Sequence, residues 1–360
     1  MHLLATTNGG LESVTADELA DLVGVDASVH HRGVVEFDGG FDDVYDLHYR
    51  SRTVHRILEV LVDAPIAELE DVYDRTREVD LAAHLPFATF GVVGTRHGTH
   101  GFTSMDVAER VGQAVIDGYR ASTGERLPVD LDDPTVRLEA YLYDDRFTLA
   151  VDLTGESLHK RPYRICEHDA PLRSTLAYSM VRLAGHGADD RLVDPMCGSA
   201  TIPIEAALAA TDRIPTPDAT PMFGALPRYD LETFRDRRTA HRTLSPTLDI
   251  EGRDRREKWL RCARANCEAA GIDRDVSLRN ADARAASIDA DCVVTNLPFG
   301  IRVSDDLRKL YAALTDRLRE GRFERFVALT TKPELLPLEP TERYDIPYGR
   351  LDASVVVYTD

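Results

Sequence analysis

Residues 192–207 read Leu-Val-Asp-Pro-Met-Cys-Gly-Ser-Ala-Thr-Ile-Pro-Ile-Glu-Ala-Ala, a pattern that predicts a buried strand, a tight turn of small residues and a helix. The strand ends at Asp194, and the small side chains after it allow backbone N–H groups to approach a ligand closely. In a doubly wound α/β sheet, nucleotide-like cofactors bind in such a turn at the carboxyl end of a strand. The stretch therefore predicts a doubly wound α/β domain with a cofactor site at residues 194–201.

A second stretch, residues 291–300, reads Asp-Cys-Val-Val-Thr-Asn-Leu-Pro-Phe-Gly. Its apolar residues predict another buried strand, which is followed by an amide, a proline, an aromatic ring and a glycine. Such a turn places the carbonyl acceptor of Asn296 and the ring face of Phe299 at one point. This arrangement suits a flat base that carries an exocyclic amino group and has left its stack.

Acidic residues follow further strands of the expected sheet. Asp254 ends a strand, where its carboxylate can accept hydrogen bonds from both hydroxyls of a ribose. Glu251 is the other candidate for that role, although an acid near a strand end is more often a surface residue. Asp282 can accept from an adenine amino group; the alternative is that it caps a helix. An insertion over residues 211–247 accounts for the long separation between the cofactor turn and Asp254.

The two stretches together resemble motifs I and IV of S-adenosylmethionine-dependent amino-methyltransferases. The Asn-Leu-Pro-Phe form of the second stretch looks like the guanine-N2 RNA methyltransferases that carry a THUMP domain, whereas adenine-N6 DNA enzymes commonly have Asn-Pro-Pro-Tyr. Residues 154–173 resemble the Gly-Glu-Ser-Leu-His-Lys-Arg connector of those enzymes. Residues 96–104, with the helix after them, resemble a THUMP domain, which typically binds the acceptor end of tRNA. Within this group the chain is most similar to the tRNA (guanine(6)-N2)-methyltransferases.

The resemblance implies S-adenosylmethionine as the cofactor, the acceptor stem of tRNA as the partner, and no metal. It implies that Asn296 and Leu297 accept from the target amino group and that Phe299 stacks on the base. The implied catalytic residues are Asn296, Leu297, Pro298 and Phe299; the implied cofactor-binding residues are Asp194, Pro195, Met196, Cys197, Gly198, Ser199, Ala200, Thr201, Asp254, Asp282, Ala283 and Asn296. The RNA-binding candidates are Arg96, His97 and His100 of the THUMP segment and Lys160, Arg161 and Arg164 of the basic linker.

One residue departs from the family pattern, because Ala200 stands where the family usually has glycine. Alanine is compatible with the turn if its φ angle is negative. Three alternative functions stay open: guanine-N2 methylation of ribosomal RNA, the same reaction on tRNA guanosine 10, and a non-catalytic RNA-binding protein, for which Ala200 is the only indication. An NAD-dependent oxidoreductase is disfavoured, because the chain lacks a Gly-x-Gly-x-x-Gly turn.

The expected fold class is α/β, with a C-terminal Rossmann-like methyltransferase domain after an α+β RNA-binding region. Residues 1–62 alternate short strands and helices in an order that predicts a ferredoxin-like domain. Residues 63–153 correspond to the THUMP domain, residues 154–173 to a basic linker, and residues 174–360 to the methyltransferase domain.

The chain is strongly acidic, with 62 Asp and Glu against 43 Lys and Arg and a net charge of −19. Only four of these bases are lysine, a composition typical of salt-adapted, halophilic proteins, so the charge does not exclude an RNA substrate. In molar salt the Debye length is about 3 Å, and only close phosphate contacts matter.

No apolar run approaches the ~20 residues of a membrane helix, and the N-terminus lacks a signal-peptide pattern. The five cysteines show neither metal-ligand nor disulfide-framework spacing, which predicts a cytoplasmic protein in a reducing compartment.

Overall fold

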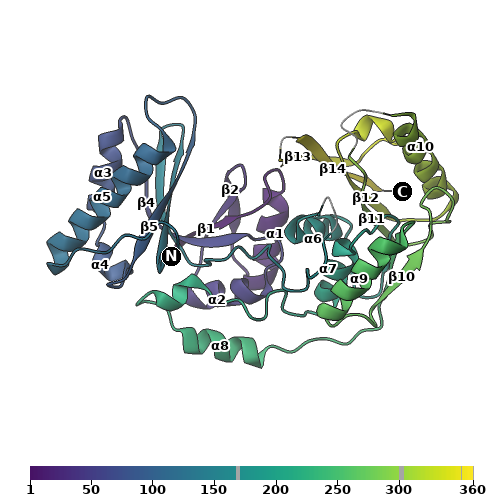
Figure 1. Ribbon diagram of the computed structural model, residues 1–360, viewed down its shortest axis with the longest axis horizontal. Coiled ribbons are helices and arrows are strands. Elements are labelled where there is room, and N and C mark those ends of the chain that lie inside the picture. The colour runs from purple at the N-terminus through teal and green to yellow at the C-terminus, as the bar shows by residue number, and fades with distance from the viewer. Residues whose placement is uncertain (168–170, 300–303, 350, 360) are drawn as a thin grey trace.

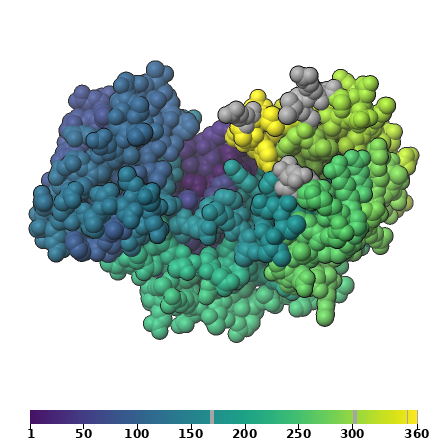
Figure 2. Space-filling view, in the orientation of Figure 1, coloured from purple at the N-terminus to yellow at the C-terminus, as the bar shows by residue number. Residues whose placement is uncertain are grey.

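The computed structural model describes residues 1–167, 171–299, 304–349 and 351–359; residues 168–170 of the linker and Gly300 of the second motif lie outside the described residues. Two seven-stranded sheets organise the chain. One belongs to the N-terminal half and the other to the C-terminal half, and Figure 1 shows them next to one another along the long axis of the molecule. In Figure 2 the surface is hollowed between the two halves, with the first N-terminal unit, in purple, at the back of the hollow.

One continuous sheet joins the two N-terminal units, in the strand order β2-β3-β1-β4-β7-β6-β5. The first unit consists of β1 (His2–Thr6), α1 (Glu12–Val23), β2 (Ala27–His31), β3 (Val34–Asp38) and α2 (Phe41–Arg50). The next strand, β4 (Arg56–Pro65), pairs with β1 on one side and with β7 on the other. The expected boundary at residues 62–63 therefore falls inside β4, and the two units share a strand.

The second unit comprises α3 (Leu69–Arg77), α4 (Leu81–His84), β5 (Phe90–His97), α5 (Ser104–Thr123), β6 (Val136–Tyr143) and β7 (Arg146–Asp152). A capping box starts α5: the Thr103 hydroxyl accepts from the backbone N–H of Asp106, and the Asp106 carboxylate accepts from that of Thr103. Gly94 allows this helix start to lie close to β5, because a Cβ there would be 2.1 Å from the Ser104 carbonyl oxygen. The apolar face of α5 is buried against the sheet.

The C-terminal half is a doubly wound sheet in the order β10-β9-β8-β11-β12-β14-β13. Its first five strands are parallel, and β14 is antiparallel to β12. Apolar clusters bury both faces, with α6, α7 and α9 on one face and α10 on the other. The strand order reverses between β8 and β11, the switch point at which such sheets bind cofactors. The elements are α6 (Ser174–Leu183), β8 (Arg191–Asp194), α7 (Thr201–Ala210), β9 (Asp249–Asp254), α9 (Glu257–Ala269), β10 (Val276–Asn280), β11 (Cys292–Asn296), α10 (Asp305–Glu320), β12 (Arg325–Thr330), η2 (Pro333–Leu335), β13 (Glu342–Tyr348) and β14 (Leu351–Thr359).

The insertion after α7 folds back onto the N-terminal half. It contains the 3-10 helix η1 (Met222–Ala225) and α8 (Leu231–Ala240), and Figure 1 draws α8 below α2. Phe223 is fully buried in the N-terminal core beside Tyr45, with 5.3 Å between the ring centroids. The Tyr229 hydroxyl donates to Glu59 Oε2 at 3.0 Å. We call residues 211–247 the strap, because they tie the C-terminal domain to the first sheet.

A disulfide joins Cys166 of the linker to Cys262 of α9, 96 residues further along the chain. The cysteine spacing predicted no disulfide, and that expectation is wrong for this pair. The linker passes over α9, where the Asn266 side-chain amide binds the backbone N–H and carbonyl of Cys166 at 2.9 and 2.8 Å. Spacing in the sequence carries no signal for such a long-range contact.

Within the residues that the structure describes, no helix has the length and apolar character that a membrane span requires. Among the same residues, no group of three or more His, Cys, Asp or Glu side chains is arranged to hold a metal ion.

Candidate cofactor and base-binding site

The cofactor turn begins at the buried carboxylate of Asp194, the last residue of β8. Its Oδ1 accepts hydrogen bonds from the backbone N–H of Met196 at 3.1 Å and from the Thr295 hydroxyl at 2.8 Å. Burial raises the pKa of Asp194 to about 7. Because Thr295 belongs to β11, this carboxylate also connects the two motifs. A bound cation, such as the amino group of an amino-acid ligand, would stabilise its charged form.

Two residues of the turn have a left-handed backbone, Gly198 with a φ of 54° and Ala200 with a φ of 66°. The negative φ that would accommodate an alanine at position 200 is therefore not present. Left-handed backbone brings Cβ close to the following carbonyl and costs an L-residue roughly 1–2 kcal/mol. Ala200 is held there because its N–H donates to the Cys197 carbonyl at 2.8 Å and its carbonyl accepts from Ile204 of α7 at 2.9 Å.

The end of β9 is bound to the cofactor turn. The backbone N–H of Gly198 donates to Asp254 Oδ2 at 3.2 Å, and that of Cys197 donates to the Arg253 carbonyl at 2.7 Å. Asp254 is half-buried beside the turn, where a ribose is expected. Pro195, Cys197, Ser199 and Thr201 of the turn are buried, and Met196 and Gly198 are partly exposed.

Glu251 is not a surface acid, because it does not face solvent, and arginine side chains already neutralise its charge. It is buried on β9, with its carboxylate 2.9 Å from Arg191, 2.8 Å from Arg253 and 3.4 Å from Arg279. Although burial raises its pKa, the hydrogen bond and charge of Arg253 bring the net pKa of Glu251 below its ordinary value. Glu251 is therefore a structural anion, and Asp254 is left as the ribose candidate.

Asp282 follows β10 and is bound by Arg284. Its Oδ1 accepts from the Arg284 backbone N–H at 3.0 Å, and both oxygens contact the guanidinium. The hydrogen bond from the Arg284 side chain lowers the pKa of Asp282 to about 2. The described residues after it form a turn and no helix, so that the helix-cap alternative is wrong. Ala283 beside it is buried.

The Asn296–Phe299 turn continues from the end of β11, next to β12. The backbone N–H of Leu297 donates to the Leu329 carbonyl at 3.0 Å and so fixes the turn. The Asn296 Oδ1 atom is buried and has no hydrogen-bond partner. Pro298 is exposed, and the half-buried Phe299 ring meets Tyr348 edge-to-face at 5.2 Å between centroids. No local motif in the sequence indicates Tyr348, an aromatic residue at the end of β13.

Two of the three linker bases are not available to phosphate, which corrects their assignment as RNA contacts. Arg161 is buried, and its guanidinium pairs with Glu205 of α7 at 3.0 Å. The Arg164 side chain is 12% exposed and donates to the Leu172 carbonyl at 2.9 Å. Lys160 is exposed, with Glu156 at 3.0 Å. The Arg161 guanidinium is enclosed by two protein carbonyls and the Glu205 carboxylate, and the Arg164 side chain is mostly buried, so Lys160 is the linker base that stays a candidate for RNA contact.

The THUMP candidates gather at the end of β5. Arg96 Nη1 lies 2.9 Å from the Gly98 carbonyl oxygen and 3.0 Å from His100 Nδ1. His97 packs against Tyr143 of β6, with 5.3 Å between ring centroids. All three residues are at least partly exposed, next to the turn that connects β6 and β7.

Family comparisons agree with this architecture. The chain matches the RMKL-like methyltransferase domain over residues 161–338, the THUMP domain over residues 67–152 and the RlmL ferredoxin-like domain over residues 2–58. The protein is thus an S-adenosylmethionine-dependent methyltransferase that carries a THUMP domain. It is 30% identical to the tRNA (guanine(6)-N2)-methyltransferase of Archaeoglobus fulgidus, over 99% of this chain and 92% of the relative. The chain belongs to the family of the tRNA (guanine(6)-N2)-methyltransferases.

Other relatives and solved structures extend the comparison. The Methanocaldococcus jannaschii tRNA (guanine(6)-N2)-methyltransferase is 28% identical over the full length of both chains. A ribosomal RNA large subunit methyltransferase K/L from Syntrophotalea carbinolica is 34% identical over 89% of this chain but only 47% of its own length. TrmN from Thermus thermophilus is 26% identical over 100% of this chain and 99% of its own, with a TM-score of 0.75. A methyltransferase in complex with SAH shares the fold at a TM-score of 0.87, with 23% identity over 99% of this chain and 97% of its own.

Proposed function

We propose that this protein is a cytoplasmic enzyme that methylates the N2 amino group of guanosine 6 in the acceptor stem of tRNA. The observation that carries the proposal is the buried Asn296 Oδ1 without a partner, at the carboxyl end of the strand beside the cofactor turn. A buried acceptor left unpaired costs about 1–3 kcal/mol. An exocyclic N–H placed there would remove that cost.

The reaction needs a better nucleophile than a free aryl amine. The N2 lone pair of guanine is delocalised into the ring. S-adenosylmethionine, when bound, would supply the methyl group from its sulfonium: the N2–methyl bond would form as the sulfur–methyl bond breaks, S-adenosylhomocysteine would leave, and one N2 proton would pass to solvent. Asn296 Oδ1 and the Leu297 carbonyl would accept from the amino group as its nitrogen becomes tetrahedral, which directs the lone pair at the methyl group. Phe299 would hold the base by stacking. Orientation and these aligned acceptors provide the acceleration.

The cofactor would lie across the carboxyl ends of three strands. Asp194 would accept from the amino group of the methionine moiety, Asp254 from the ribose hydroxyls and Asp282 from the adenine amino group. The turn fits such a ligand, because its small residues leave the backbone accessible and its carboxylate has a pKa of about 7 without a cation beside it. Arg96, His97, His100 and Lys160 remain the proposed contacts to RNA.

Two alternatives are guanine-N2 methylation of ribosomal RNA, the substrate class in the name of the longer K/L relatives, and the same reaction on tRNA guanosine 10. Transfer of tritiated methyl from S-adenosylmethionine to unmodified tRNA, followed by mapping of the modified nucleotide, separates these substrates. Substituting inosine at position 6 removes the N2 amino group. Methylation of that inosine tRNA would show that another atom is the target, and label on ribosomal RNA alone would show that the substrate is wrong.

A further inference from the structure

Tyr348 makes an aromatic contact with Phe299, the residue proposed to stack on the target base. The two ring centroids lie 5.2 Å apart and the ring planes meet at 72°, an edge-to-face arrangement. Both rings are half-buried and pack against the same apolar cluster of the methyltransferase domain. Aromatic pairs prefer this geometry because the positive edge of one ring meets the negative face of the other. The contact therefore favours one orientation of the Phe299 ring.

The Tyr348 ring is itself held at both ends. Its backbone pairs with Leu351 at the end of the β13–β14 hairpin, and its hydroxyl donates to the Pro171 carbonyl at 3.0 Å. Pro171 lies just before α6, in a different part of the domain. Because the backbone and the hydroxyl are both bound, the ring has little freedom to turn away from Phe299.

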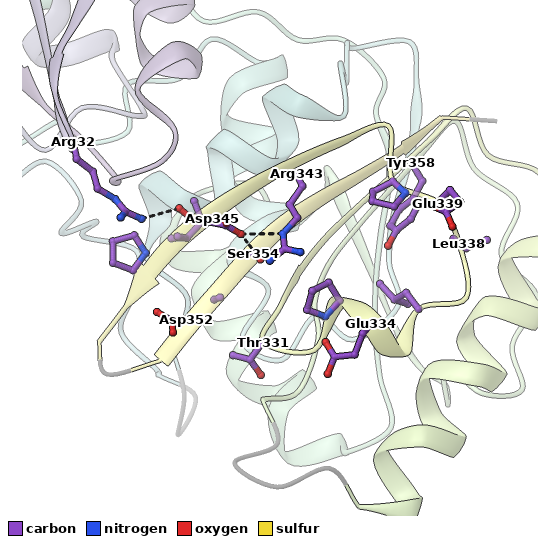
Figure 3. Close-up of a pocket in the computed structure, with 16 residues that line it drawn as sticks. Arg32, Thr331, Glu334, Leu338, Glu339, Arg343, Asp345, Asp352, Ser354 and Tyr358 are labelled. Carbon is purple, nitrogen blue, oxygen red and sulfur yellow. Dashed lines mark hydrogen bonds and ion pairs between the residues drawn. The ribbon is translucent and has the colours of Figure 1, made fainter.

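The N-terminal half contacts the strand that carries Tyr348. Arg32, between β2 and β3, donates through Nη2 to the backbone carbonyl of Asp345 at 3.0 Å, and Figure 3 shows this side chain reaching β13. Gly10 lies against the same carbonyl, where a Cβ would be 2.3 Å from the oxygen. Asp345 is three residues before Tyr348 on β13. Both halves of the molecule therefore hold the backbone that carries this aromatic ring.

We propose that Tyr348 is a positioning residue of the methylation reaction that acts through Phe299: its edge-to-face contact holds the Phe299 ring in the orientation that stacks on the target guanine. This inference rests on the proposed function. A Phe299 ring that rotates freely would have to be ordered when the base binds, and ordering a side chain on binding reduces affinity. A ring that is already fixed in the free enzyme avoids that loss. Tyr348 should therefore affect the binding of the RNA and leave the binding of the cofactor unchanged.

A double-mutant cycle tests whether Tyr348 acts through Phe299. Tyr348→Leu should lower kcat/KM for the RNA substrate by about fivefold, mainly by raising KM, which is within the range of one aromatic pair. Tyr348→Phe keeps the ring and should lose less than Tyr348→Leu. In a Phe299→Ala background, Tyr348→Leu should cost less than about twofold, because the ring that it positions is gone. Calorimetry should give the wild-type affinity for S-adenosylmethionine in each variant.

Tyr344→Leu is the matched control. Tyr344 lies four residues before Tyr348 on the same face of β13 and packs against the same apolar cluster. Its substitution should leave kcat/KM within about twofold of wild type. A fivefold loss from Tyr348→Leu that persists in the Phe299→Ala background would mean that Tyr348 acts on the RNA independently. A loss of cofactor affinity, or an equal loss from Tyr344→Leu, would indicate general packing. Each of these results overturns the inference.

The kinetics are measured on the RNA that the wild-type enzyme methylates in the mapping experiment, so that a wrong target nucleotide does not decide the result. If Phe299→Ala leaves KM unchanged, the stacking role in the proposed function is wrong and the inference is overturned with it. If Phe299→Ala raises KM but its effect and that of Tyr348→Leu are additive, the inference alone is overturned.

Discussion

Arg161 Nε lies 3.0 Å from Oε1 of Glu205, and neither side chain is exposed to solvent. Arg161 belongs to the linker, and Glu205 to the helix directly after the cofactor turn. The same guanidinium donates to the carbonyl of Arg52 in the N-terminal half at 3.1 Å. A single side chain thus joins three parts of the chain, and it stabilises their mutual arrangement.

Arg161→Ala should therefore lower the free energy of unfolding by about 3–5 kcal/mol, because it leaves the Glu205 carboxylate buried without its cation. Chemical denaturation measures the change. Lys160→Ala is the control: this side chain is 61% exposed, and its removal should change stability by less than about 0.5 kcal/mol. Similar effects for the two variants would contradict a structural role for Arg161.

Lys160→Ala should weaken tRNA binding and reduce the slope of log affinity against log salt by about one, the value for one phosphate contact. Binding measured over a salt series gives this slope. Arg164→Ala serves as the comparison, because its side chain is mostly buried and should leave the slope unchanged. A Lys160→Ala slope equal to that of wild type would mean that the linker makes no phosphate contact.

Ala200→Gly should change stability by less than about 1 kcal/mol, because opposing effects are of similar size. Glycine relieves about 1–2 kcal/mol of left-handed strain. Glycine also removes a buried methyl group, which costs about 0.8 kcal/mol of stability. It makes the unfolded chain more flexible, which costs about a further 0.4–1 kcal/mol. Ala200→Val should instead destabilise by more than about 2 kcal/mol, since a branched side chain at this φ is both strained and overpacked. Thermal denaturation of both variants tests the balance; a tolerated valine would contradict the left-handed turn.

Affinity for S-adenosylmethionine should rise with pH through about 7, by about tenfold per unit below that value. The cationic amino group binds the ionised form of Asp194, whose pKa is raised to about 7 by burial. In the absence of the cofactor, the free energy of unfolding should instead fall as pH rises from about 4 to 7. Over this range Asp194 has released its proton in the unfolded chain but keeps it in the folded chain. Calorimetry across this range tests the affinity, and Asp194→Asn should bind weakly with no such dependence. Equal pH profiles for the two proteins would remove Asp194 from the amino-group site.

Asn296→Ala should abolish turnover while leaving the affinities for cofactor and tRNA nearly unchanged. Its contact to the amino nitrogen strengthens mainly in the transition state, so kcat and kcat/KM should fall together. Phe299→Ala should also raise KM, because stacking of about 1–3 kcal/mol holds the base in the ground state. Single-turnover kinetics on an acceptor-stem substrate distinguish the two effects. An Asn296→Ala enzyme that retains its rate would show that this turn is not the catalytic motif.

Short-range patterns predicted the parts of the site that depend on neighbouring residues. The strand-turn-helix at 192–207 and the turn after Thr295 are built from local backbone, and the structure places both at the switch point of one sheet. Charge and burial were harder to predict. The linker looked like a basic surface because sequence shows charges but not what encloses them. Glu205, 44 residues away from Arg161, decides that this guanidinium is buried.

By itself, the sequence determined the class of the three domains and the strand-turn-helix and strand-turn forms of residues 192–207 and 292–299, because periodicity and turn chemistry act over a few residues. Only the tertiary structure decided the sharing of β4, the return of the strap to the first sheet and the Cys166–Cys262 bond. Each of these depends on contacts between segments distant in the chain. Their energies come from burial and packing, which no local pattern of residues encodes.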